Sequence, residues 1–253
     1  MHRLDIMREI LINESILKSK NIAYLYTALL DIANQVNAKM DIKNSPNRVE
    51  LSIYLIEDYY SLIKQEIEDK IADIIAVSYK YDYFIKRIKT TNLSEYETKL
   101  LLSSLISADL EEDKRYIIKK LSYYTEYSID GIFNFRMKPL KEKWQEIASY
   151  IPKSFSKNQL KDFIEYIVKD KKGKRVYYEN GSLYDKRFNI LRRKELIGLE
   201  NEENTTLIEI LLSGAGEVEL ASPLSKIEEK YLKEFYGEGV IFSDNYFLVP
   251  KKS

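Results

Sequence analysis

The chain has 253 residues, enough for one large or two ordinary domains, and its 40 basic side chains balance 40 acidic ones. A net charge of zero disfavours a general affinity for nucleic acid or anionic membranes. Cys is absent, which excludes disulfides and thiolate sites, and the single His, at position 2, argues against a zinc site or a Ser-His-Asp relay. We therefore expect no metal, no cofactor and no recognisable catalytic group.

The longest apolar run covers residues 22–30, whereas a membrane-spanning helix needs roughly 20 apolar residues. The run starts too far from Met1 for a secretory signal, and Asp31 interrupts it. We expect a buried helix there, no membrane partner and a cytoplasmic location.

The spacing of apolar side chains predicts three helices in the first ninety residues. Leu4, Met7 and Leu11 indicate a short first helix, and a second is expected over residues 22–36, before a turn at residues 44–47. Neither Gly nor Pro occurs in residues 47–130, and Ile residues recur there at spacings of three and four. This pattern predicts one long helix over residues 53–89.

Two more helices are expected before Gly131. Ser94 and Glu97 have the spacing of a capping box at a helix start, and a further helix is predicted over residues 111–127. Residues 129–131 are expected to end this helical run. Alternation of aromatic and polar residues over 133–137 then predicts a short extended stretch.

Two helices follow the extended stretch. Pro139 suits the first position of one, which carries Trp144 on its inner face and stops at Pro152. Ser156 and Gln159 cap the other.

The pattern changes near residue 170, where strand signals begin. Asn180-Gly181 predicts a hairpin, and Gly214 is expected to close a helix over residues 205–212. Strands at 218–220 and 240–242 flank a helix that we expect Ser222 to cap and Gly237 to end, which predicts a parallel β-α-β crossover. A last antiparallel strand is expected at 246–249.

These elements predict an α+β protein in two parts. A mainly helical domain is expected over residues 1–170. A small α/β domain with the crossover and the hairpin is expected over residues 171–253.

One candidate binding segment is basic and covers residues 169–194. It carries aromatic side chains among its cations, as contacts to phosphates and bases require. The alternative is a charged linker into a hairpin whose aromatics pack inward, so nucleic-acid binding is possible but not favoured. The cations that we single out are Lys171, Lys172, Lys174, Arg175, Arg192, Arg193 and Lys194.

A second candidate is a row of carboxylates, Glu66, Asp69 and Asp73, which helical spacing places on one face. Such a row could hold a divalent ion for a metal-dependent hydrolase. Lys64 and Lys70 lie on the same helix, so we favour a solvated charged face.

The third candidate is the segment of residues 128–138, SIDGIFNFRMK. Arg136 could contact an anion or pair with Asp130, and the aromatics could instead plug the helical core. We expect at least two of Ile132, Phe133 and Phe135 to be deeply buried. We also expect Arg136 to be paired with a carboxylate, because an unpaired buried guanidinium is too costly.

This segment resembles the "IDGF-NFRLK" block of the YtxC-like sporulation proteins of spore-forming Firmicutes. The order of features around it agrees with that family from residue 53 to residue 244, although Pro139 and the absence of Cys depart from its pattern. The resemblance implies a cytoplasmic, sporulation-associated protein without transferable catalytic residues. We therefore expect a non-enzymatic protein that acts by binding a protein partner.

Overall fold

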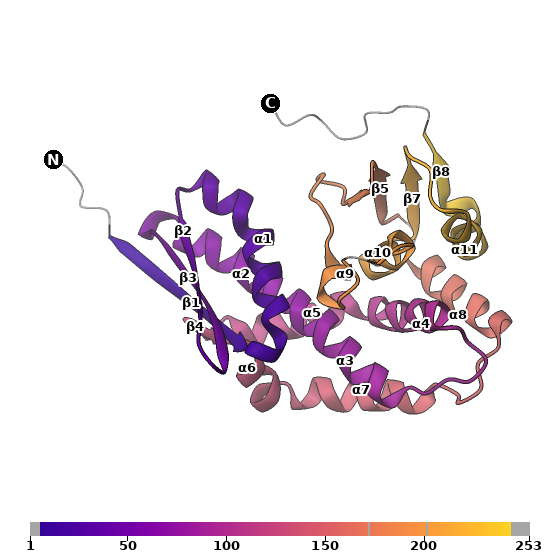
Figure 1. The fold of residues 1–253 in the computed structure, drawn as a ribbon, viewed down its shortest axis with the longest axis horizontal. Helices are drawn as coiled ribbons and strands as arrows, with labels where there is room; N and C mark the ends of the chain where they lie inside the picture. Colours follow the sequence, from indigo (N-terminus) through magenta and orange to yellow (C-terminus); the bar gives the residue numbers. More distant parts are fainter. Residues whose placement is uncertain (1–5, 172, 201, 244–253) are drawn as a thin grey trace. The chain divides into compact units, whose positions relative to one another are not determined.

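The computed structural model describes residues 6–171, 173–200 and 202–243 (Figure 1). The chain is an α+β protein with two compact units, and each unit contains a four-stranded sheet. Unit 1 combines Met1–Tyr79 with Glu111–Gln145, and unit 2 combines Lys80–Leu110 with Glu146–Ser253. Each unit is thus built from two chain segments, whereas the sequence predicts a continuous division after residue 170.

The sheet of unit 1 has the strand order β2-β3-β1-β4, in which β1 runs antiparallel to β3 and parallel to β4. The helix expected through Leu4, Met7 and Leu11 is wrong, because β1 begins at Met7, while Leu4 lies outside the described residues. The burial of Ile10, Ile12 and Glu14 alternates with period two, as a strand requires. The strands are β1 (Met7–Ser15), β2 (Lys39–Asn44), β3 (Arg48–Ile56) and β4 (Glu126–Ser128).

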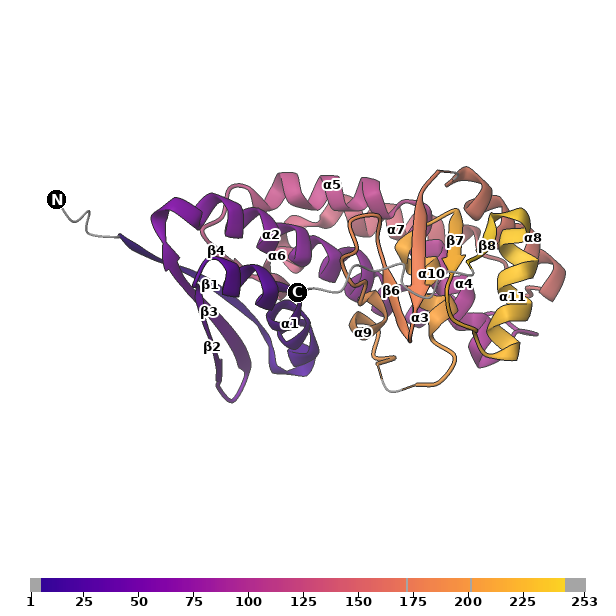
Figure 2. The ribbon, with the colours of Figure 1, turned by 90° about the horizontal axis from the view of Figure 1, so that it is seen from above.

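Helices α1 and α2 lie on one side of this sheet, and Figure 2 shows both of them there. The predicted second helix is confirmed by α1. The predicted long helix begins later than residue 53, because residues 48–56 form the strand β3. This strand pairs with β1 on one edge and with β2 on the other. The helices of this part of the chain are α1 (Ser19–Gln35), α2 (Tyr60–Asp73), a π-helical turn (Ile74–Tyr79) and α3 (Lys80–Arg87), of which α3 belongs to unit 2, and 3₁₀ turns lie at Ile16–Lys18 and Glu57–Tyr59.

The segment around Gly131 folds differently from the sequence prediction. The helix predicted over residues 111–127 ends at Leu121, and the chain then forms β4. The predicted extended stretch is wrong, because α6 begins directly after β4. Gly131 serves close packing rather than a turn, since a Cβ there would lie 2.8 Å from Ser128 Oγ. The helices are α5 (Leu110–Leu121), α6 (Ile129–Arg136) and α7 (Lys138–Tyr150).

Unit 2 has a sheet of order β6-β5-β7-β8, in which β7 runs parallel to both β5 and β8. The predicted hairpin and the predicted parallel crossover are both confirmed. The strands are β5 (Arg175–Glu179), β6 (Ser182–Tyr184), β7 (Glu217–Leu220) and β8 (Val240–Phe242). The strand predicted at 246–249 lies outside the described residues.

The helices of unit 2 pack in pairs, with α4 against α8 and α10, and α8 against α11. Both predicted capping boxes, at Ser94 and Ser156, are confirmed. Ser222 does not cap the crossover helix, because its Oγ accepts the Asn180 N–H, and Ser225 caps the helix instead. The helices are α4 (Glu95–Ala108), α8 (Lys157–Asp170), α9 (Arg193–Leu196), α10 (Thr206–Ser213) and α11 (Lys226–Tyr236), followed by a 3₁₀ turn at Gly237–Gly239.

The length and the hydropathy of a helix decide whether it could cross a membrane. Among the helices within the described residues, none combines the length and the apolar character that crossing a membrane requires.

Candidate binding site on unit 1

Helix α6 divides its side chains between the core of unit 1 and the surface. Ile132 is buried, and the half-buried Phe133 stacks on Trp144 with ring centroids 5.9 Å apart. Phe135 is 82% exposed, and Arg136 is exposed as well. The prediction that two of the three apolar side chains are deeply buried is therefore wrong. A strand would turn Phe133 and Phe135 to the same side, whereas in the helix α6 these two residues lie on opposite sides, so only Phe133 packs toward the core.

Arg136 also differs from its prediction. No carboxylate within the described part of the chain pairs with its guanidinium, so the expected ion pair is wrong. The side chain is exposed, and water solvates the charge that burial would have obliged a carboxylate to balance. Asp130, the partner that the sequence suggested, binds Arg48 instead. Arg136 is thus a cation at the surface of α6 whose hydrogen-bond donors have no carboxylate partner among the described residues.

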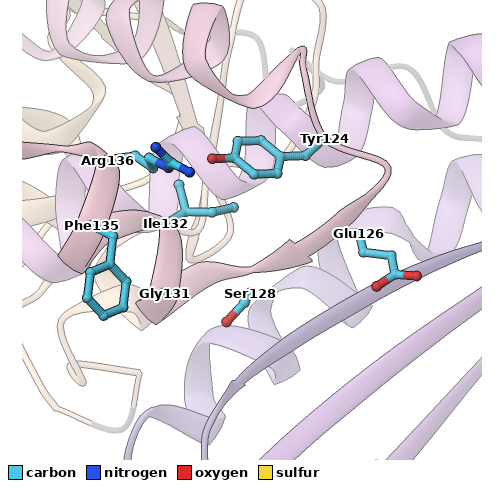
Figure 3. Close-up of a pocket in the computed structure, with 7 residues that line it drawn as sticks. All are labelled: Tyr124, Glu126, Ser128, Gly131, Ile132, Phe135 and Arg136. Carbon is cyan, nitrogen blue, oxygen red and sulfur yellow. The ribbon is translucent and has the colours of Figure 1, made fainter.

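A hollow of about 300 Å³ lies where β4, α6 and the turn before β4 meet. Figure 3 shows Ile132 near its centre, with the Arg136 guanidinium and the Tyr124 hydroxyl directed toward one another. Its lining residues are Tyr124, Glu126, Ser128, Gly131, Ile132, Phe135 and Arg136. All of them come from one continuous stretch of chain, which β4 and α6 fold back on itself. The hollow therefore combines apolar walls with one cation and one exposed carboxylate.

The Arg48 side chain fixes the base of this hollow. Its guanidinium donates to both Asp130 oxygens, at 2.6 and 3.2 Å, to Ser128 Oγ at 3.0 Å, and to Asn13 Oδ1. Burial would raise the pKa of Asp130, but the Arg48 hydrogen bonds and charge outweigh it and lower that pKa. A bidentate pair of this kind resists rotation, so the first turn of α6 is held against β3.

A buried carboxylate lies behind α6 and was not singled out from the sequence. Glu14 is fully buried and accepts hydrogen bonds from Tyr79 Oη at 2.9 Å, Asn21 Nδ2 at 3.2 Å and its neighbour Ser15 N at 2.8 Å. Burial raises the pKa of Glu14. The Tyr79 ring lies 4.3 Å from the Phe133 ring, so this polar group packs beneath α6. Since Glu14 has no exposed surface, its role is to join β1, α1 and the π-helical turn.

The basic segment of residues 169–194 lies in unit 2, and several of its cations bind protein groups. Arg175 pairs with Glu217 at 2.9 Å, and Arg192 pairs with Glu195 at 3.0 Å. Lys171 Nζ donates to the Ala108 carbonyl, and the Lys174 carbonyl accepts from Gly216 N. Lys172 lies outside the described residues.

Arg193 and Lys194, the last two cations of the basic segment, hold α9 against α10. Arg193 Nη1 donates to the Leu212 carbonyl at 2.9 Å, and Lys194 Nζ donates to Thr205 Oγ1 at 3.1 Å. Their backbone N–H groups both donate to the buried Glu209 carboxylate. Burial raises the pKa of Glu209. Arg193 and Lys194 are half-buried and bind groups of unit 2, so they help to hold the fold together. Cations that served only to contact phosphates would not need these bonds within the protein.

The aromatic side chains of the basic segment also have partners within unit 2. Tyr177 packs on Phe188 with centroids 5.4 Å apart, and Tyr178 is buried. The ring contact of Tyr177 and the burial of Tyr178 match the alternative in which the aromatics of the segment pack within the fold. They leave the affinity of the segment for nucleic acid as a prediction.

Two carboxylates of the row on α2, Asp69 and Asp73, form an ion-pair cluster with Lys114. Lys114 Nζ lies 2.8 Å from Asp69 Oδ1 and 3.0 Å from Asp73 Oδ1. Asp73 is only 3% exposed, so the favoured interpretation of a fully solvated face is wrong at this position. Within the described ranges no group of three or more potential metal ligands comes together.

In comparisons with known proteins, no protein-family model, curated protein or solved structure matches the chain. The candidate site therefore stands on its own chemistry. That chemistry is suited to recognition, because the hollow presents an exposed aromatic ring, an exposed guanidinium and one carboxylate.

Proposed function

We propose that this chain is a sporulation-associated, non-enzymatic protein that binds a partner protein through the hollow on unit 1. The observation that carries the proposal is the 82% exposure of Phe135 beside an apolar hollow and beside Arg136, with which no carboxylate of the described residues pairs. Exposed aromatic and Arg side chains around a depression are enriched where proteins bind one another. The association with sporulation rests on the resemblance of residues 129–138 to the YtxC-like block.

The local energetics of α6 support a contact surface. Phe133 and Ile132 already fill the space between α6 and the rest of unit 1, so the Phe135 ring is not needed there. Leaving a large aromatic ring in water costs free energy that burial at an interface would recover, about 2–3 kcal/mol. The Arg48–Asp130 pair holds the first turn of α6 in place, so the side chains of the hollow are ordered before a partner arrives.

Photo-crosslinking tests the proposal. A benzophenone amino acid replaces Phe135 in one variant, and it replaces Tyr166 in a matched control. Tyr166 is 74% exposed on α8 of unit 2, so the two probes have similar access to solvent. The expected result is a discrete adduct in sporulating cells from position 135 that position 166 does not form.

The same adduct should be lost when Arg136→Gln is added to the variant with the probe at position 135. Identical adducts from positions 135 and 166, or none from position 135 above the background of unlabelled protein, would refute the proposed surface. Purified wild-type protein incubated with the identified partner then gives the affinity directly.

A further inference from the structure

We infer that the occupant of the hollow is the free C-terminal end of a partner chain, added as a short strand beside β4. The inference rests on the proposed function and names the part of the partner that unit 1 recognises. Three features meet at the hollow: an open strand edge, an apolar depression of one-residue size, and a guanidinium that no carboxylate in the described part of the chain binds.

The first feature is the outer edge of β4. This strand pairs with β1 on one side only, with Ile12 opposite Tyr127, and it is the last strand in its sheet order. Within the described residues no strand lies on its other side. An open edge offers backbone N–H and C=O groups to an extended peptide, and domains that bind peptides by strand addition use such an edge.

The second feature is that the space beside β4 is closed at one end. Ser128 ends β4, and the next residue, Ile129, is already the first of α6. Figure 3 shows α6 rising from the end of β4, with Arg136 directed toward Tyr124, so that β4, α6 and Tyr124 border the open hollow. A strand laid along β4 would meet α6 and could not continue. A chain terminus fits this arrangement, whereas an internal segment would have to turn away.

The third feature is the charge around the hollow. Arg136 lies on the α6 side and Glu126 lies on the β4 side. A guanidinium binds a carboxylate through two parallel hydrogen bonds, which suits a terminal carboxylate at the closed end. The exposed Glu126 would attract a basic side chain a few residues earlier in the partner. Charge complementarity therefore predicts a partner that ends in a large apolar residue with a Lys or Arg shortly before it.

The volume agrees with a single terminal residue. At about 300 Å³ the hollow is at the lower limit of ligand cavities in proteins. A hollow of this size would accommodate one aromatic or large aliphatic side chain together with its carboxylate. Ile132 at its centre and Phe135 on its rim supply the apolar contacts.

The test uses two fluorescent hexapeptides that share one sequence, with Lys at the third position and Phe at the last. One has a free C-terminal carboxylate and the other a C-terminal amide. Full-length protein is titrated with each, as wild type, Arg136→Gln and Lys138→Gln. Lys138 is the matched control, because it is 82% exposed, follows α6 closely and pairs with Glu142 rather than lining the hollow.

The free acid should bind wild type and Lys138→Gln about tenfold or more tightly than the amide. Arg136→Gln should reduce that preference to less than about twofold. Backbone amide exchange over residues 126–128 should slow when the free acid is bound, since strand addition protects those groups.

Equal affinity for acid and amide overturns the inference, and so does the absence of binding at millimolar peptide. If both peptides bind equally and Phe135→Ala abolishes both, the proposed function still holds with a different occupant. If neither peptide binds, crosslinking at position 135 decides the proposed function by itself. The two claims therefore fail by different measurements.

Discussion

The Arg48 guanidinium and the Asp130 carboxylate form a bidentate pair, at 2.6 and 3.2 Å, between residues that lie 82 positions apart in the chain. Arg48 is the first residue of β3 and Asp130 is in the first turn of α6, beside the hollow. The pair thus joins the sheet of unit 1 to the helix that carries Phe135 and Arg136. Its integrity should govern both the stability of unit 1 and the shape of the candidate site.

Replacing Arg48 with Met should lower the free energy of unfolding by about 1–2 kcal/mol. The estimate is at the low end for charged hydrogen bonds, because Arg48 is 39% exposed and water screens part of the interaction. Arg8→Met is the control, since Arg8 pairs with Glu57 at a more exposed place on the same sheet. Urea denaturation of both variants tests this, and an equal midpoint for the two would contradict it.

Trp144→Ala should destabilise the protein by about 3–5 kcal/mol, as expected for a large core side chain. The side chain is fully buried, as the sequence predicts, and its indole N–H donates to Asp113 Oδ2 at 3.0 Å. Removing it also leaves Phe133 without the ring on which it stacks. Circular dichroism during urea denaturation gives the change, with Tyr150→Ala, 75% exposed on the same helix, as the control. A urea midpoint for Trp144→Ala equal to that of wild type would be inconsistent with this packing.

Glu97 should make unit 2 less stable in acid. Burial alone would raise its pKa, but hydrogen bonds from Ser94, Lys157 and Tyr231 hold the pKa at about 2. A carboxylate whose pKa is lower in the folded state stabilises the fold above its unfolded value, near 4.3, and that stabilisation is lost as pH falls. The loss should amount to about 3 kcal/mol between about pH 5 and pH 2.

The Glu97→Gln variant isolates this charge, because Gln at the same position can still complete the capping box. Its stability should depend less on pH in that window than the stability of wild type. Glu95→Gln removes a carboxylate from the same helix turn that is 86% exposed, and should follow wild type. Parallel curves of unfolding free energy against pH for wild type and Glu97→Gln would rule out the effect.

Arg193→Gln should lower the free energy of unfolding of the protein by about 1–3 kcal/mol. It removes donors to the Leu212 and Ser213 carbonyls at the end of α10, and those carbonyls are then left without this partner. Lys186→Gln, at an exposed position of the same basic segment, should leave stability unchanged. If the two variants melt alike, Arg193 is a surface cation, and salt-dependent binding of nucleic acid to the segment becomes the next measurement.

Features that depend on neighbours in the chain could be predicted from the sequence. The Ser94 and Ser156 capping boxes are each completed within four residues, and the Asn180-Gly181 turn needs only two residues that accept positive φ, observed at 49° and 81°. The β7-α11-β8 crossover is similarly local, because a helix between two short strands brings them together in parallel. The α+β class follows from such elements.

The tertiary structure alone decided the candidate site. Residues 7–15 carry apolar side chains compatible with either a helix or a strand, and pairing with β3, some forty residues later in the chain, selects the strand. Likewise, residues 129–136 could alternate as a strand or turn as a helix, and the bonds from Arg48 to Ser128 and Asp130 hold the helical start. That choice turns Phe133 toward Tyr79 and Trp144 and places Ile132, Phe135 and Arg136 on the other side of α6, where Phe135 and Arg136 reach the surface. The orientation of these side chains follows the helical period, and contacts distant in sequence selected that period.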